Sequence, residues 1–216
     1  MRYDAVVLDL DGTLLNTLPD ITRVVNEAIA NIGMAPVSRE RIRSLVGSGV
    51  EALLEGLGVP EQWNAPLSEE ISSMYARQTD SEAELFPGVT PMLDALFEWG
   101  GPVCVLSNKT TAGVKKALAD HLPEYPFAAI RGSGPGRPAK PSPDVLLEML
   151  SEIGSAPEKA VMAGDGEADV KVAAAAGTAH IACLWGYRSR DQLAAEGAGS
   201  FAESPGDVLR IMGLRP

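Results

Sequence analysis

Short apolar runs bounded by polar or Gly/Pro residues are the feature that most constrains the fold of this chain. Five of these runs carry β-branched side chains and have the length of buried strands. They are Ala5–Leu10, Val103–Leu106, Phe127–Ile130, Ala160–Ala163 and His180–Leu184. Helix-like stretches lie between the later runs, at Thr110–His121, Pro143–Ile153 and Ala168–Ala176. This alternation predicts an α/β fold whose core is a doubly wound, mainly parallel, Rossmann-like sheet.

The connection between the first two runs is far too long for a simple crossover. About ninety residues separate Leu10 from Val103, whereas a strand-to-strand crossover needs about a dozen or more. Apolar residues recur at three-to-four spacing in Pro19–Ile32, and further helix-like stretches are Arg39–Leu45, Val50–Leu57 and Leu67–Gln78. We predict a helical cap domain at residues 16–83, inserted into a catalytic core of residues 1–15 and 84–216. Ligands bind beyond the carboxyl ends of strands in such sheets, so the insert is expected to roof the site, although an insert without a function remains an alternative.

Charge excludes several classes of partner. The chain has 18 Lys and Arg residues against 29 Asp and Glu residues, a formal net charge of −11. Without a compact basic patch, such a chain is repelled by nucleic acid and by anionic membranes. Its apolar runs are shorter than the roughly 20 residues of a membrane helix, and no basic-then-apolar leader precedes them. We expect a cytoplasmic protein that binds neither nucleic acid nor a membrane.

Two acidic motifs follow strand-like runs. Asp9-Leu10-Asp11-Gly12-Thr13 ends the first run, and alternation along a strand would point the Asp9 and Asp11 carboxylates the same way. Gly12 permits a sharp turn, and Thr13 offers a hydroxyl group. The second motif, Gly164-Asp165-Gly166-Glu167-Ala168-Asp169, places Asp165 and Asp169 one helical turn apart. Both motifs are expected at the carboxyl edge of the sheet.

Four carboxylates in one place require neutralisation. One Mg²⁺ and one lysine would cancel three of the four charges, and a retained proton would cancel the last. Oxygen ligands without nearby His or Cys favour Mg²⁺ over zinc. The lysine candidate is Lys140, in a loop stiffened by prolines. Ser107-Asn108-Lys109 follows the second run and opens a helix, an arrangement that suits either a phosphate or an ordinary helix cap.

Together these motifs resemble the haloacid dehalogenase-like hydrolases, in particular their phosphoglycolate phosphatase-like branch. The resemblance rests on Asp9-x-Asp11-Gly12-Thr13, Ser107, Lys140 before a proline, and Gly164-Asp165-x-x-x-Asp169, in that order, and it covers most of the chain. It implies phosphoryl transfer through an aspartyl-phosphate, with Asp9 as nucleophile and Asp11 as general acid and base. It further implies that Ser107 and Lys140 hold the phosphoryl group. The Mg²⁺ ligands would be Asp9, Asp165 and the Asp11 main-chain carbonyl, with Asp169 either as a further ligand or as a support for the other ligands.

The remaining site residues are expected around the substrate. Gly12, Thr13 and Asn108 are candidate phosphate contacts, and Gly47, Ser48 and Gly49 join two helices of the insert, where backbone amides could approach a small anion. A plain interhelical turn is the alternative for this segment. Arg23, Arg43 and Arg77 could clamp a substrate carboxylate, or they could be solvated surface residues.

Compared with many members of the family, this chain departs from the pattern at three positions. It has Asn16 in place of an acidic residue, Gly166 in place of a hydroxyl residue, and Thr110 where phosphoglycolate phosphatases often have proline.

The favoured function is a Mg²⁺-dependent phosphatase acting on a small phosphomonoester, with phosphoglycolate as the best single candidate. A pyrophosphatase and a sugar-phosphate mutase would share the same core chemistry. A non-enzymatic receiver-like phospho-switch is disfavoured, because such modules end near 120 residues. The sequence leaves a monomer and a homodimer equally open.

Overall fold

A six-stranded parallel sheet forms the centre of the protein. The computed structural model describes residues 3–134 and 136–215. The strand order is β5-β4-β1-β6-β7-β8. The strands are β1 Ala5–Leu8, β4 Val103–Thr110, β5 Ala129–Ser133, β6 Ala160–Gly164, β7 Ala179–Cys183 and β8 Phe201–Ala202, and every neighbouring pair is parallel. The predicted doubly wound α/β sheet is therefore confirmed, with β1 near its middle.

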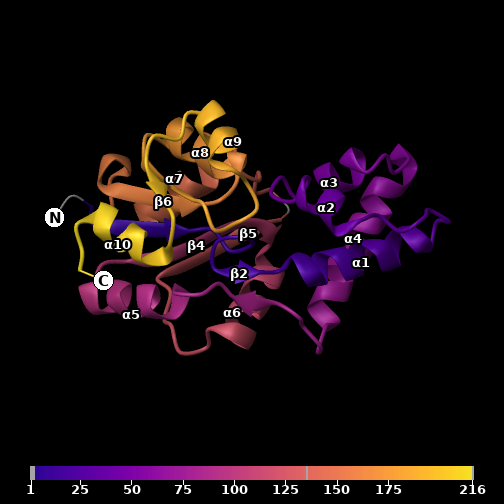
Figure 1. Cartoon of the computed structure of the whole chain (residues 1–216), viewed down its shortest axis with the longest axis horizontal. Helices are drawn as coiled ribbons and strands as arrows, with labels where there is room; N and C mark the ends of the chain where they lie inside the picture. Colours follow the sequence, from indigo (N-terminus) through magenta and orange to yellow (C-terminus); the bar gives the residue numbers. More distant parts are fainter. Residues whose placement is uncertain (1–2, 135, 216) are drawn as a thin grey trace.

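Helices cover both faces of the sheet (Figure 1). On one face, helices α5 (Val89–Trp99), α6 (Thr111–His121) and α10 (Pro205–Met212) share an apolar cluster with Val6 and Leu8 of β1. On the other face, α7 (Asp144–Glu152) and α8 (Glu167–Ala176) pack against Ala5 and Val7. The short 3-10 turn η1 (Pro157–Lys159) and helix α9 (Arg190–Ala195) complete the core. Because both faces of β1 are buried, its sequence is continuously apolar and does not alternate with polar residues.

Four helices lie at one end of the sheet and form the helical insert (Figure 1). They are α1 Leu18–Ala30, α2 Arg39–Arg43, α3 Val50–Gly56 and α4 Glu61–Arg77. Their apolar sides form a separate cluster that includes Val24, Ile29, Ile42, Leu54 and Leu67. A two-stranded antiparallel ribbon, β2 (Leu15–Asn16) with β3 (Glu84–Leu85), connects the insert to the core. The ribbon lies at the predicted boundaries, and the division into two domains at residues 16–83 stays a prediction.

Several element boundaries differ from the sequence prediction. Strand β1 ends at Leu8, so Asp9 and Asp11 lie in the loop beyond it, whereas β4 continues to Thr110. Helix α4 begins at Glu61, six residues before the predicted start, and contains Pro66 in its second turn.

The segment after Leu193 packs on the core. Val208, Leu209 and Met212 of α10 belong to the same apolar cluster as α5. Within the described residues, no helix has the length and apolar character needed to cross a membrane.

Candidate active site

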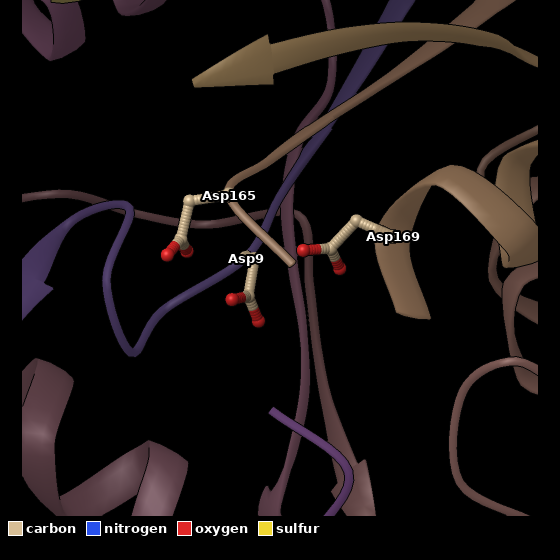
Figure 2. A group of neighbouring side chains, drawn as sticks. All are labelled: Asp9, Asp165 and Asp169. Atoms are coloured by element: carbon tan, nitrogen blue, oxygen red, sulfur yellow. The ribbon is translucent and has the colours of Figure 1, made fainter. Parts of the chain in front are cut away.

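Three aspartates come together at the carboxyl edge of the sheet. Asp9 follows β1, Asp165 follows β6, and Asp169 lies in the first turn of α8. Each offers a carboxylate oxygen within 4.8 Å of the other two, and all three residues are buried. Figure 2 shows the three carboxyl groups facing a common space. The predicted meeting of the two acidic motifs therefore occurs, although Asp9 is positioned by a loop and not by strand alternation.

Lys140 lies between two of these carboxylates. Its Nζ atom is 2.7 Å from Asp9 Oδ1, 2.6 Å from Asp169 Oδ1 and 3.1 Å from the Leu106 carbonyl oxygen. Burial opposes ionisation of Lys140, but Asp169 and Asp9 outweigh it and raise the pKa of the lysine above its usual value. Burial also raises the pKa of Asp9 well above its usual value; Lys140 acts in the opposite direction, and Asp169 adds to the increase. The sequence-based pairing of Lys140 with the acidic cluster agrees with these contacts.

Asp165 is held by groups from two other segments. It accepts hydrogen bonds from the Thr13 hydroxyl group (2.9 Å) and from the Tyr187 main-chain N–H (2.7 Å). Burial raises the pKa of Asp165 to about 7, while the bond from Tyr187 lowers it. Gly12 has a φ of +95°, and a Cβ atom added there would collide with the Asp165 carboxylate. Neither Gly12 nor Thr13 lines the cavity described below, so both lie beside Asp165 and not against the space for a substrate.

Asp11 has different partners from Asp9. Its Oδ1 atom accepts a 2.6 Å hydrogen bond from Thr17 Oγ1 and lies 3.2 Å from Lys109 Nζ. Its side chain is not part of the three-carboxylate group, although Asp9 and Asp11 both line one cavity between the sheet edge and the helical insert. The Asp11 side chain is thus placed toward the cavity, and the metal contact of its main-chain carbonyl stays a prediction.

Ser107 and Asn108 also line this cavity. The Asn108 amide donates to the carbonyls of Gly47 (2.8 Å) and Lys140 (2.9 Å) and accepts from the Lys140 main-chain N–H (2.7 Å). Asn108 therefore connects the insert to the lysine loop. Gly47 and Gly49 line the cavity, whereas Ser48 does not.

Lys109 changes the charge balance expected from the sequence. The ammonium group of Lys109 neutralises the Asp11 carboxylate, while Lys140 neutralises one of the three charges of Asp9, Asp165 and Asp169. Four carboxylates and two ammonium groups leave two negative charges, which one divalent cation would cancel. The retained proton expected from the sequence is therefore not needed to balance the charge, although a general-acid role for Asp11 would require one there. The buried oxygen donors of Asp9, Asp165 and Asp169 fit a hard divalent cation, and they could hold one.

Sequence reasoning missed the segment Gly186-Tyr187-Arg188, which follows β7. The Tyr187 hydroxyl accepts hydrogen bonds from the main-chain N–H groups of Thr17 (3.0 Å) and Leu18 (3.1 Å), at the start of α1. Arg188 forms an ion pair with Glu167 and donates to three carbonyls of the insert. The signal available in the sequence was its position, because this segment also leaves the carboxyl end of a buried strand.

Comparison with known proteins agrees with this arrangement. Residues 6–183 match the family model described as haloacid dehalogenase-like hydrolase. The phosphoglycolate phosphatase of Mannheimia succiniciproducens is 28% identical over 222 residues, covering 98% of this chain and 99% of that protein. The phosphoglycolate phosphatase of Nitrosococcus oceani is 33% identical over 192 residues, covering 85% of each chain.

A solved structure has the same fold over almost its whole length. It is a protein from Lactobacillus delbrueckii provisionally named phosphoglycolate phosphatase, with a TM-score of 0.90, 26% identity and coverage of 98% of this chain and 99% of that one. With the family model matching most of the chain and the acidic motifs meeting at the sheet edge, the chain belongs to the haloacid dehalogenase-like hydrolase family, in its phosphoglycolate phosphatase-like branch.

Proposed function

We propose that this protein is a Mg²⁺-dependent phosphatase that hydrolyses a small phosphomonoester through an aspartyl-phosphate on Asp9. The position of Asp9 carries the proposal. Among the described residues, Asp9 alone belongs both to the three-carboxylate group and to the wall of the cavity. A nucleophile for phosphoryl transfer needs this double placement, next to the cation and facing the substrate.

Asp9, Asp165 and Asp169 would hold Mg²⁺, together with the Asp11 main-chain carbonyl that the family resemblance implies. All three side-chain donors are carboxylates, which suit Mg²⁺. When bound, the ion supplies positive charge that orients the phosphoryl oxygens and makes the phosphorus more electrophilic. The ammonium group of Lys140 offsets the repulsion between the Asp9 and Asp169 carboxylates and, with Ser107, would stabilise the negative charge on the transferring phosphoryl group.

The reaction has two balanced steps. A carboxylate oxygen of Asp9 attacks phosphorus while the bond from phosphorus to the ester oxygen breaks, and the leaving alkoxide takes a proton from the Asp11 carboxyl group. Water then attacks the phosphorus of the aspartyl-phosphate, the Asp11 carboxylate takes a proton from this water, and the bond to Asp9 breaks. The products are the alcohol and inorganic phosphate, and both aspartates return to their starting states.

The substrate is a free small molecule. Phosphoglycolate is the first ester to test, because the similar proteins from Mannheimia and Nitrosococcus are named for it. The net charge of −11 disfavours nucleic-acid and membrane-bound substrates, and we place the activity in the cytoplasm. Gly47 and Gly49, together with Asn108, would face the substrate from the side of the insert.

A panel of phosphate esters tests this function. Purified protein is incubated with phosphoglycolate, short alkyl phosphates and hexose phosphates, first with Mg²⁺ and then with excess chelator, and free phosphate is measured. We expect Mg²⁺-dependent release from at least one small ester and loss of release with the chelator. No release from any ester, or release unaffected by the chelator, would contradict the proposal.

A further inference from the structure

The cavity over Asp9 and Asp11 has two chemically different sides. It has a volume of about 70 Å³. Its core side carries the polar groups already described, including Asp9, Asp11 and Ser107. Its other side comes from the helical insert and is formed mainly by Ile21, Val25, Val46, Val50, Leu53 and Ile71. The residues that would bind and attack the phosphoryl group lie on the core side of the cavity. The leaving group of the ester must therefore lie against the insert side.

The insert side carries no charged side chain among the described lining residues. Its side-chain polar groups are the hydroxyls of Ser72 and Tyr75. The arginines that could have clamped a carboxylate are directed elsewhere: Arg43 donates to the Gly186 carbonyl, and Arg77 donates to the Ser73 carbonyl. Arg23 lies 3.8 Å from both Asp20 and Asp80. None of the three lines the cavity.

Among the described residues that line the cavity, Lys109 is the one with a positively charged side chain. Its Nζ atom is 3.2 Å from Asp11 Oδ1, and it also lies 4.3 Å from the centre of the Tyr75 ring. While Asp11 is ionised, it balances the charge of Lys109. A carboxylate on the leaving group would have to compete with Asp11 for Lys109, or lose its hydration against apolar walls without a partner.

We infer that the leaving-group side of this site takes a short, uncharged, largely apolar alcohol, so that the enzyme hydrolyses short alkyl phosphates at least as efficiently as phosphoglycolate. The inference rests on the proposed phosphatase function and adds a second class of ester to it. The alcohol must be short, because the whole cavity has about half the volume of an engineered ~150 Å³ apolar cavity that accepts benzene. One hydroxyl on the alcohol could be accommodated by Ser72 or Tyr75.

The test is a substrate series of increasing chain length. kcat/KM is measured for methyl, ethyl and n-propyl phosphate, for phosphoglycolate, and for the primary amide of phosphoglycolate. This amide has nearly the same shape as phosphoglycolate but lacks the charge of its carboxylate. The alkoxide leaving groups of the alkyl series differ little in reactivity, so a trend reports contact with the apolar wall. We expect kcat/KM to rise by about tenfold or more from methyl to n-propyl phosphate, since one methylene in an apolar pocket is worth ~10-fold or more. We also expect the amide and n-propyl phosphate to be at least as good as phosphoglycolate.

A pair of variants at one position separates charge from size. Val50 is half-buried at the start of α3 and lines the cavity. Val50→Lys adds a cation to the apolar side, whereas Val50→Met adds length without charge. We expect Val50→Lys to raise the ratio of kcat/KM for phosphoglycolate to that for n-propyl phosphate by about tenfold, the size of a typical single charge interaction. Val50→Met should keep the wild-type ratio. Because each ratio is measured on one protein preparation, partial unfolding does not affect it.

The possible results separate the preference for apolar alcohols from the phosphatase function itself. A rising alkyl series with phosphoglycolate no better than n-propyl phosphate supports the inference. A flat series, or a kcat/KM for phosphoglycolate measurably higher than that for n-propyl phosphate, overturns it and leaves the phosphatase proposal standing. If neither these esters nor the hexose phosphates of the wider panel are hydrolysed, both the inference and the phosphatase proposal are wrong.

Discussion

Arg188 of the core donates a 2.6 Å hydrogen bond from Nη2 to the main-chain carbonyl of Val46 in the helical insert. The Nη1 atom of the same guanidinium donates to the Arg43 carbonyl (2.9 Å), and its Nε is 2.8 Å from both carboxylate oxygens of Glu167. Glu167 lies between Asp165 and Asp169 in the sequence. One buried side chain thus connects the loop that lines the cavity to the segment that carries two of the three aspartates.

Replacing Arg188 by lysine should loosen the insert over the site. Lysine keeps the charge but cannot reproduce the fork that bonds Glu167 and several carbonyls together, so buried carbonyls lose their donors. We expect KM to rise by about tenfold with a smaller change in kcat, and the free energy of unfolding to fall by about 1–3 kcal/mol. Steady-state kinetics and denaturant unfolding measure both.

Arg190→Lys is the matched control. Arg190 is half-exposed and pairs with an exposed carboxylate, Glu203, so its replacement should change neither KM nor stability appreciably. Equal effects of the two substitutions, or a loss of kcat at unchanged KM in Arg188→Lys, would show that Arg188 does not position the insert.

Gly12→Ala should weaken the metal site. The added Cβ would meet the Asp165 carboxylate, and the positive φ of +95° costs an L-residue roughly 1–2 kcal/mol. Asp165 is a proposed Mg²⁺ ligand, and disturbing the groups that surround a ligand typically weakens metal binding by about 10–100-fold, so we expect the Mg²⁺ dissociation constant to rise by that factor. Titration calorimetry with Mg²⁺ gives the value.

Gly33→Ala separates backbone strain from the collision. Gly33 has a φ of +78°, and nothing lies within 4 Å of a Cβ atom added there. This control should lose a similar amount of stability while binding Mg²⁺ like the wild-type protein. If both variants bind Mg²⁺ equally well, Gly12 is not needed for the placement of Asp165.

His180 should make the protein less stable in mild acid. Neither imidazole nitrogen has a hydrogen-bond partner in the described chain, and burial lowers the pKa of His180 from 6.5 to about 4. Between pH 6.5 and pH 4, His180 binds a proton in the unfolded chain but not in the folded chain. Its contribution to the free energy of unfolding therefore falls as the pH falls. The loss attributable to this residue is about 2 kcal/mol at pH 5 relative to pH 7.5.

The comparison uses the free energy of unfolding at pH 7.5 and pH 5. Protonation of Asp165, whose pKa is raised to about 7, stabilises the folded protein over the same interval, so the prediction concerns the difference between proteins. On going from pH 7.5 to pH 5, His180→Gln, which cannot bind the proton, should show a smaller decline, or a larger gain, than the wild-type protein by about 2 kcal/mol. His121→Gln, a change at an exposed hydrogen bond to Ser81, should keep the wild-type pH dependence. Identical declines in all three proteins would mean that His180 takes up its proton without unfolding.

The fold was predictable where burial leaves a simple pattern. Strands β1 and β6 are buried on both faces and therefore appear as continuous apolar runs. The ribbon of β2 and β3 and the edge strand β8 have two residues each, too few to give any periodicity. Helix α5 was not predicted, although its apolar residues Val89, Met92, Leu93 and Leu96 follow helical spacing.

The site residues that directly follow strands could be predicted from the sequence. The side-chain pairs that form only when distant segments fold together could not. The positions of Asp9 and Asp165 after β1 and β6 were enough to bring them together in the prediction. The pairing of Asp11 with Lys109 was missed, because a side-chain contact between residues so far apart leaves no mark in the sequence. The contact of the Tyr187 hydroxyl with Thr17, across 170 positions, is of the same kind.

Attack by Asp9 on phosphorus is the central claim, and trapping of the phosphorylated protein tests it most directly. The protein is mixed with Mg²⁺ and its best ester, quenched in acid within one turnover, digested, and examined by mass spectrometry, in parallel with Asp9→Asn and with Asp191→Asn, a change at an exposed aspartate. The account predicts a phosphoryl group on the peptide that contains Asp9 in the wild-type protein and in Asp191→Asn. In Asp9→Asn it predicts no such group, and a kcat lower by about 10⁴-fold or more. Full turnover by Asp9→Asn, or a phosphoryl group trapped on another residue, would contradict it.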